Sequence, residues 1–145
     1  MNDIVARFET ACRECGLKLT LQRLEIFREL LAATDHPSAD TVYTRLRDRF
    51  PALSRDTVFR TLATLAAHGL ISKVETQDSV ARYEVVRQKH HHFICRQCGT
   101  IVDFLWPEME AMLLPTAATA CGCVENTSVI AHGICSSCLA SRRQG

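Results

Sequence analysis

Apolar residues recur every three to four positions in four stretches of the first half of the chain, which is the spacing of one helix face. The first stretch begins near residue 3 and stops at Gly16. Thr20, Ser38 and Ser54 each precede one of the other stretches, and their hydroxyl groups are typical helix N-caps. The pattern therefore predicts helices over about residues 3–15, 21–35, 39–50 and 55–68, the last two ended by Pro51 and Gly69.

Polarity alternates in the residues that follow, as it does in half-buried β-strands. Two alternating runs, 70–75 and 81–86, flank a turn-rich tetrapeptide at 76–79, so they predict a hairpin. A short turn at 51–53 joins the third and fourth predicted helices, which indicates a helix-turn-helix. A hairpin after that motif completes a winged helix.

The pattern changes after Val86, where residues 87–89 form a short polar hinge. Beyond it the sequence predicts strands around Phe93 and over 100–104 and 123–134, with a helix from Pro107 through Leu113. We therefore expect an α+β protein. A winged helix-turn-helix domain occupies residues 1–86, and a small α/β dimerisation domain with a structural zinc site occupies residues 87–145.

Composition narrows the class of protein. The 145 residues are 47% hydrophobic, enough for a buried core, yet no apolar run is long enough to span a membrane. The N-terminus lacks a basic and then apolar export signal, so we expect a cytoplasmic protein with no membrane partner. In that compartment eight cysteines indicate metal or thiol chemistry rather than a disulfide framework.

The net charge of +1 does not by itself indicate a nucleic-acid-binding protein. Five arginines between residues 45 and 60, set against Asp48 and Asp56, nevertheless give a local surplus of +3. The solvent face predicted for helix 55–68 is small and rich in threonine, so it fits a DNA major groove and leaves Arg60 to reach bases or phosphates. An ordinary amphipathic helix is the alternative, and the hairpin that follows favours DNA binding.

Two C-x-x-C pairs, Cys95 with Cys98 and Cys135 with Cys138, have the spacing of zinc knuckles. Four thiolates leave no position for a substrate, so this spacing predicts a structural Zn²⁺ site. Buried or redox-active cysteines are the alternative. The pair Cys12 and Cys15 fits packing in a helix better than redox chemistry, and the sequence assigns no role to Cys121, Cys123 or His132.

The run His90-His91-His92 requires different chemistry. If a strand starts here, His90 and His92 project from one face and His91 from the other. One iron, manganese or zinc ion could then take both outer imidazoles, unless the run is only a solvated polar tract.

Two enzyme classes compete with a DNA-binding regulator. A zinc hydrolase needs three protein ligands, an open water and a general base, for which Glu84 is available, but no H-x-x-x-H helix or deaminase motif occurs. A thiol oxidoreductase needs its C-x-x-C at a helix start after a strand, whereas Cys95 lies in a predicted strand and knuckle. We therefore expect no enzymatic activity.

Several segments together resemble the ferric uptake regulator family across nearly the whole chain. They are H-P-S-A-D at 36–40, S-R-D-T-V-F-R-T-L at 54–62, H-G-L-I at 68–71, H-H-H-F-I-C-R-Q-C-G at 90–99 and C-S-S-C at 135–138. The resemblance implies a dimeric repressor whose partners are double-stranded operator DNA and a second copy of the chain. It also implies a regulatory Fe²⁺ or Mn²⁺ site; the ligands would be His36, Glu84, His90, His92 and Asp103. The candidate DNA contacts are Arg55, Thr57, Phe59 and Arg60, with Phe59 in place of the usual Tyr.

The resemblance points to two branches of the family. Glu84 is typical of iron-uptake regulators, whereas Asp103 is similar to the peroxide-responsive branch. Lys89 and His91 stand where many iron regulators carry ligands of an additional site, and an ammonium group repels a metal cation. We expect a repressor that senses peroxide through its bound ion, so that metal ions and peroxide are its small-molecule ligands. An iron-responsive or zinc-uptake regulator is the alternative.

Overall fold

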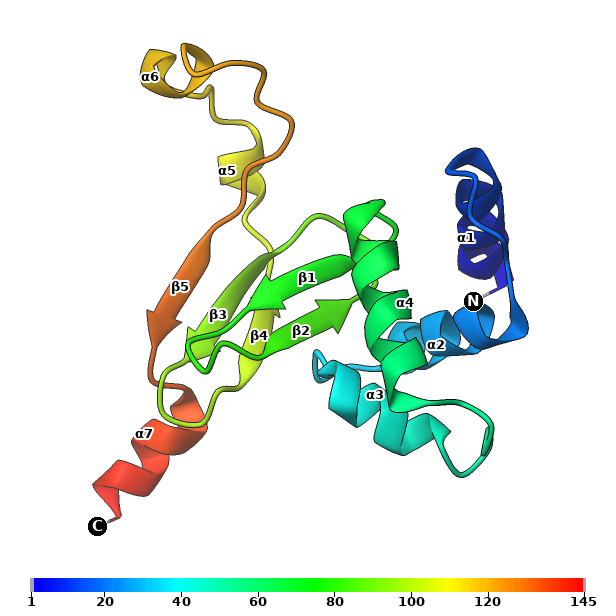
Figure 1. The fold of residues 1–145 in the computed structure, drawn as a ribbon. Helices are drawn as coiled ribbons and strands as arrows, with labels where there is room; N and C mark the ends of the chain where they lie inside the picture. The colour runs from blue at the N-terminus through cyan, green and yellow to red at the C-terminus, as the bar shows by residue number, and fades with distance from the viewer. Residues whose placement is uncertain (1, 145) are drawn as a thin grey trace. The chain divides into compact units, whose positions relative to one another are not determined.

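The computed structural model describes residues 2–144, and the chain divides into two units between Arg87 and Gln88. The first unit contains four helices and a hairpin, and the second contains a three-stranded sheet and three helices. Figure 1 shows the order of these elements along the chain.

The helices of the first unit form where the apolar periodicity predicts them. They are α1 (Asn2–Glu14), α2 (Leu21–Ala32), α3 (Ala39–Leu46) and α4 (Arg55–Ala67). The side chains of Thr20, Ser38 and Ser54 each accept a hydrogen bond from the backbone N–H three residues on, which confirms the three predicted caps. Gly69 follows α4 with φ of +70°, a backbone conformation that glycine adopts without strain.

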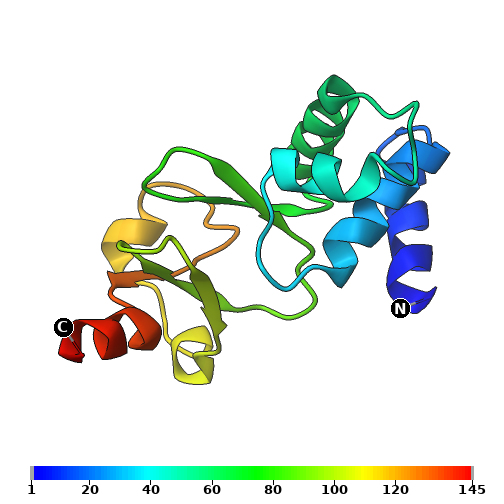
Figure 2. The same ribbon diagram turned by 90° about the horizontal axis from the view of Figure 1, so that it is seen from below.

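One hydrophobic core joins these helices. Ile26 and Leu30 of α2, Leu46 of α3, and Leu62 and Leu65 of α4 are almost completely buried. Two orthogonal views show α2, α3 and α4 packed together (Figures 1 and 2). α1 joins this core through Cys12 and through Phe8, which stacks on Phe27 with ring centroids 3.8 Å apart; Cys12 is therefore a packing residue.

The predicted hairpin is present, with shorter strands than the alternation suggested. β1 (Ser72–Glu75) pairs antiparallel with β2 (Ala81–Glu84), with Ser72 opposite Glu84. β2 is also held to the segment before α3, because Tyr83 donates its N–H to the carbonyl oxygen of Pro37. Helix-turn-helix and hairpin together make the first unit a winged helix.

The sheet of the second unit has the order β4-β3-β5. β3 (His91–Cys95) is central, antiparallel to β4 (Ile101–Phe104) and parallel to β5 (Ile130–Gly133). α5 (Pro107–Glu110) and α6 (Thr116–Thr119) interrupt the connection from β4 to β5, and α7 (Ser136–Arg143) follows β5.

Three element predictions are wrong in extent. The third helix ends at Leu46 rather than at residue 50, because Pro51 disfavours helical geometry in the residue before it and residues 47–49 form a turn instead. The helix that starts at Pro107 ends at Glu110. The strand predicted over 123–134 covers only Ile130–Gly133, since the earlier residues have no strand partner. Neither α6 nor α7 was predicted.

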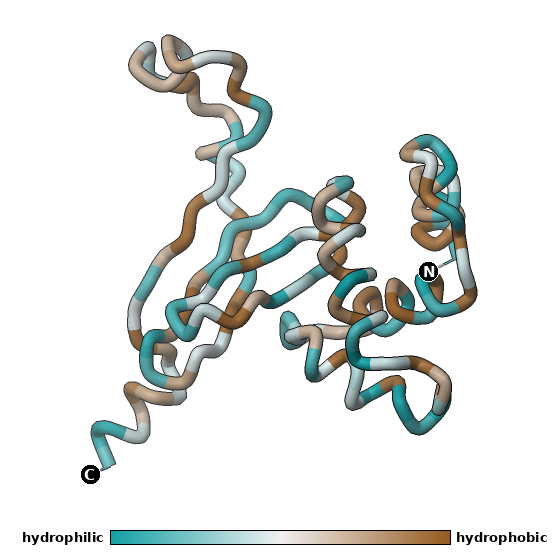
Figure 3. The backbone as a smooth tube through the Cα atoms, in the orientation of Figure 1, coloured by the Kyte–Doolittle hydropathy of each residue, from teal (hydrophilic) through white to brown (hydrophobic). Residues whose placement is uncertain are grey.

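The second unit has a very small core. Its only buried residues within the described chain are His91, His92, Ile94 and Cys95, all on β3. Apolar segments nevertheless continue through the exposed connection between β4 and β5 (Figure 3). Leu105, Met112 and Leu113 are 56%, 67% and 95% exposed.

Candidate metal centres and DNA-binding face

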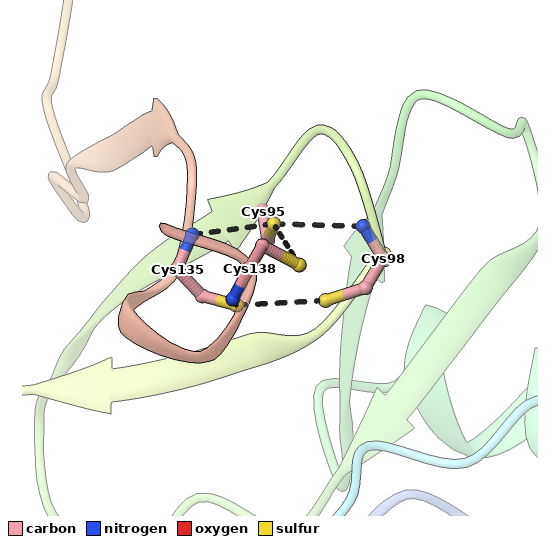
Figure 4. Close-up of side chains that lie close together, drawn as sticks. All are labelled: Cys95, Cys98, Cys135 and Cys138. Atoms are coloured by element: carbon pink, nitrogen blue, oxygen red, sulfur yellow. Dashed lines mark hydrogen bonds between the residues drawn. The ribbon is translucent and has the colours of Figure 1, made fainter. Parts of the chain in front are cut away.

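Four cysteines converge in the second unit. Cys95 ends β3, Cys98 lies in the following turn, Cys135 caps α7, and Cys138 lies in the first turn of that helix. All four sulfur atoms lie within 4.8 Å of one another, and the side chains point toward a common centre (Figure 4). Gly99, with φ of +75°, lets the chain turn back after the first knuckle.

The sulfur separations match a tetrahedral ion. Four sulfurs about 2.3 Å from a common zinc centre lie about 3.8 Å apart. The Sγ atoms of Cys95 and Cys138 are 4.0 Å apart, and those of Cys98 and Cys135 are 3.7 Å apart. The two C-x-x-C pairs therefore interleave, and four soft donors leave no position for a substrate.

Backbone N–H groups favour the thiolate form of this cluster. Those of Cys98 and Cys135 donate to the Cys95 sulfur at 3.5 and 3.3 Å. The N–H of Cys135 and then that of Cys98 lower the pKa of Cys95 to about 6, whereas hydrogen bonding to the Cys135 side chain raises the pKa of Cys138 to about 12. One proton therefore leaves easily and another is retained, which is the behaviour of a thiol set that needs a cation to become fully ionised.

A second pair of potential ligands lies in the winged helix. His36 Nε2 is 2.9 Å from Glu84 Oε2, and their side chains are only 5% and 10% exposed. His36 has φ of +50°, an unusual conformation for a residue with a side chain. It is followed by Pro37, whose carbonyl oxygen is bound to β2, so the loop and the strand that carries Glu84 are tied together.

Three further potential ligands meet in the second unit. His90 and His92 project from the same side, with their Nε2 atoms 3.1 Å apart, as the strand alternation predicts. Asp103 lies opposite His92 in the β3–β4 register, and its Oδ1 is 3.6 Å from His90 Nε2 and 3.4 Å from His92 Nε2. Imidazole nitrogen and carboxylate oxygen without thiolate fit iron or manganese, whereas the four thiolates fit zinc.

The candidate DNA contacts lie on α4. Phe59 is 42% exposed, and the Arg55 guanidinium lies over its ring at 5.4 Å from the centroid. Arg60 is largely exposed and pairs with Asp56 one turn earlier, at 3.0 Å. Thr57 is half-buried, and its hydroxyl group lies 2.8 Å from that of Ser54 in the helix cap, so it is less available to a ligand than the arginines.

The arginine surplus of the sequence is neutralised in the folded unit. Each of the five arginines has an acidic partner: Arg45 with Asp35, Arg47 with Asp48, Arg49 with Glu29, Arg55 with Asp40, and Arg60 with Asp56. Five cations against five anions leave a net charge of zero, whereas the local sequence gives +3. Exposed ion pairs are weak, at about 0–1 kcal/mol, so phosphate can compete for these guanidinium groups.

Sequence analysis missed two other groups of residues. Lys18 and Arg23 line the same hollow of about 350 Å³ as Arg60. Their position on either side of the Thr20 cap was the available signal. In the second unit Glu110 lies between Lys89 Nζ, at 2.6 Å, and His91 Nε2, at 3.1 Å. Nothing in the sequence indicated that contact.

A winged helix, a four-thiolate centre and imidazole–carboxylate sets define a class of protein: metal-dependent DNA-binding regulators. The sequence profile of the ferric uptake regulator family matches residues 14–127. This chain therefore belongs to the ferric uptake regulator family, whose members are transcription regulators. None of the helices within residues 2–144 combines the length and the apolar character needed to cross a bilayer.

Two characterised relatives are described as peroxide regulators. The "Peroxide-responsive repressor PerR" of Staphylococcus epidermidis is 30% identical over 126 residues, which cover 87% of this chain and 84% of that protein. The "Peroxide operon regulator" of Bacillus subtilis is 32% identical over 126 residues, which cover 87% of each chain.

Solved structures come from both branches. The ferric uptake regulator Fur of Helicobacter pylori has a TM-score of 0.78 at 27% identity and covers 95% of this chain and 93% of its own. PerR from Streptococcus pyogenes has a TM-score of 0.54 at 28% identity and covers 92% of each chain. The chain therefore has the fold of the ferric uptake regulator family. Its nearly equal identities to Fur and PerR do not distinguish an iron regulator from a peroxide regulator.

Proposed function

We propose that this protein is a repressor whose regulatory iron or manganese ion is held by His36, Glu84, His90, His92 and Asp103, and that its iron form senses peroxide. The observation that carries the proposal is the thiolate-free cluster of His90, His92 and Asp103, with donor atoms 3.1–3.6 Å apart. The names of the Staphylococcus epidermidis and Bacillus subtilis relatives support the choice of peroxide.

Two of these ligands belong to the winged helix and three to the second unit. Binding of one ion by both sets favours the conformations in which the sets meet, and only such a differential contact shifts a conformational equilibrium. A bound Fe²⁺ ion would supply the electron that cleaves peroxide next to its ligands. One peroxide oxygen would be added to the imidazole carbon of His36 or His90, and the other would leave as water. The ligand nitrogen then becomes an N–H and no longer binds the ion, so the preference for the DNA-binding conformation is lost.

The operator is read by α4, with Arg55, Phe59 and Arg60 exposed toward the groove and Thr57 at its N-terminus. The repressor acts as a homodimer in the cytoplasm, where its operator DNA lies, and it is a regulator rather than an enzyme. A second copy of the chain buries the exposed apolar side chains of the second unit. The core of that unit is too small to stabilise it alone.

The test is to load zinc-containing protein with Fe²⁺ or, as the control, with Mn²⁺, and to add equimolar peroxide. We expect one added oxygen on the peptide of His36 or His90 in the iron form, together with loss of operator binding. The manganese form should keep unmodified histidines and should still bind the operator. These outcomes are measured by peptide mass spectrometry and by fluorescence anisotropy of labelled operator DNA.

An iron-responsive regulator is the second candidate, because Glu84 is one methylene longer than the aspartate of the peroxide branch and can fill an additional position on the ion. The similarity to Helicobacter pylori Fur agrees with it. If the histidines stay intact after peroxide and operator binding follows the free Fe²⁺ concentration, the protein is an iron-responsive regulator rather than a peroxide sensor.

A further inference from the structure

His91 is the histidine that the proposed regulatory site does not use, and it is the most enclosed of the three. Its side chain is 1% exposed and faces away from His90 and His92, because successive residues of a strand point to opposite sides. The ring lies against those of Phe104 and Trp106, at centroid distances of 5.6 and 6.3 Å.

Both ring nitrogens of His91 are engaged. Nδ1 accepts the backbone N–H of Val129 at 3.0 Å, so the ring proton lies on Nε2. Nε2 then donates to Glu110 Oε1 at 3.1 Å. A buried imidazole held at both ends has one tautomer and one orientation.

Glu110 is itself held in place. Its Oε2 is 2.6 Å from the ammonium nitrogen of Lys89, and hydrogen bonding from Lys89 is the main reason that the pKa of Glu110 lies below its usual value. The carboxylate therefore stays ionised at neutral pH as the acceptor for His91. The chain of contacts from Lys89 through Glu110 and His91 to Val129 joins the start of β3, helix α5 and the residue before β5.

We propose that Glu110 and Lys89 are positioning residues for the regulatory metal, because they fix His91 and with it the two ligands that flank it. His90 precedes the first residue of β3, where strand ends fray, and its backbone is continuous with that of His91. With His91 clamped from the opposite face, His90 and His92 keep the 3.1 Å approach of their Nε2 atoms. An ion then binds ligands that are already ordered, and less conformational entropy is lost.

This inference rests on the proposed function, so the experiment measures binding of Mn²⁺ to zinc-loaded protein by calorimetry. Glu110→Ala should weaken Mn²⁺ affinity by about 10–100-fold, the range for residues that orient metal ligands. Glu110→Gln keeps an oxygen acceptor for His91 but loses the charge, so its affinity for Mn²⁺ should lie between those of the wild type and Glu110→Ala. Glu108→Ala is the matched control, because it removes an exposed carboxylate from the same helix, and it should bind as wild type does.

Lys89→Met separates positioning from simple electrostatics. Removal of an ammonium group next to His90 would strengthen cation binding by charge alone, whereas loss of the clamp weakens it. We expect weaker Mn²⁺ binding in Lys89→Met, with zinc content unchanged. In imidazole ¹⁵N NMR spectra of Glu110→Ala, the Nε2–H signal of His91 should shift because it loses its acceptor, while Nδ1 remains the acceptor for the N–H of Val129.

Three results would overturn the inference: wild-type affinity in Glu110→Ala, tighter binding in Lys89→Met, or an equal loss in Glu108→Ala. A wild-type protein that takes up no Mn²⁺ or Fe²⁺ beyond its zinc would instead refute the proposed function, and this inference with it.

Discussion

At the scale of single residues, the cysteines divide by environment rather than by number. The sulfur atoms of Cys95, Cys98, Cys135 and Cys138 lie close together, and backbone N–H groups donate to those of Cys95 and Cys135, whereas Cys12 is packed among apolar side chains. Cys15, Cys121 and Cys123 are exposed. Only the first group has the geometry of a metal centre, so substitution of one of its members should differ in kind from substitution elsewhere.

We predict that Cys98→Ser loses the structural zinc and with it the fold of the second unit, because metal binding at such centres supplies about 10–16 kcal/mol of folding free energy. Cys121→Ser is the control and should keep one zinc per chain. The zinc content per chain is measured by inductively coupled plasma mass spectrometry. Since the pKa of Cys138 is about 12 without an ion, zinc binding releases its proton, and zinc affinity should fall as pH falls. Full zinc content in Cys98→Ser would contradict the assignment.

Arg60→Ala should weaken operator binding and reduce the slope of log K against log salt by about 0.9 if the contact is to phosphate. Arg7→Ala provides a matched control, because Arg7 forms an equally exposed ion pair one turn from its partner, Asp3, on α1. Operator affinity is measured by fluorescence anisotropy over a range of salt concentrations. Equal effects of the two substitutions would exclude a specific contact.

At the level of the elements, acidic side chains neutralise the positive charge of α4. Asp40 of α3 lies 2.6 Å from Arg55, and Asp56 pairs with Arg60, so the two arginines proposed to contact DNA are both neutralised within the first unit. The packing of α3 against α4 is what brings Asp40 to Arg55. The acidic partners therefore reduce the attraction of α4 for phosphate.

Asp40→Asn should strengthen operator binding severalfold and steepen its salt dependence, because Arg55 becomes a free cation while the side chain keeps its size. Asp3→Asn makes the same change of charge on α1 and should have little effect. The measurement is the same titration over salt concentration. Unchanged or weaker binding in Asp40→Asn would show that Arg55 does not approach the phosphates.

At the scale of the whole molecule, the two units differ in how their stability is supplied. The first has a continuous core from Phe8 to Tyr83. Among the described residues of the second unit, Ile94 and Cys95 are the only buried hydrophobic ones. We propose that bound metal and a second copy of the chain supply the stability that this small core does not. β5 has an unpaired edge in its sheet, and Ile130 on it is 43% exposed.

Ile130→Lys should dissociate the dimer, because a charge on an apolar edge strand opposes its pairing and burial. Val80→Lys is the matched control, since Val80 is 44% exposed in the first unit. The molar mass is measured by light scattering with chromatography. A dimer of unchanged stability in Ile130→Lys would place the interface elsewhere.

Features that depend on near neighbours along the chain could be predicted from the amino-acid sequence. Each cap hydroxyl acts three residues away, each knuckle closes over a two-residue spacer, and His90 and His92 share a face because a strand has a period of two. For these the local backbone geometry is sufficient, and the helices, the hairpin and the two kinds of metal ligand could be predicted.

Features that depend on contacts between distant segments could not be predicted from the sequence and follow from the folded structure. Residues 123–128 have the alternation of a strand, but the paired register of β5 begins only at Ile130, so they form no strand. The local arginine surplus disappears because Glu29, Asp35 and Asp40, all earlier in the chain, fold against it. Glu110 reaches His91 only through the placement of α5. Pairing, charge compensation and burial each need two segments brought together, and that information is not local.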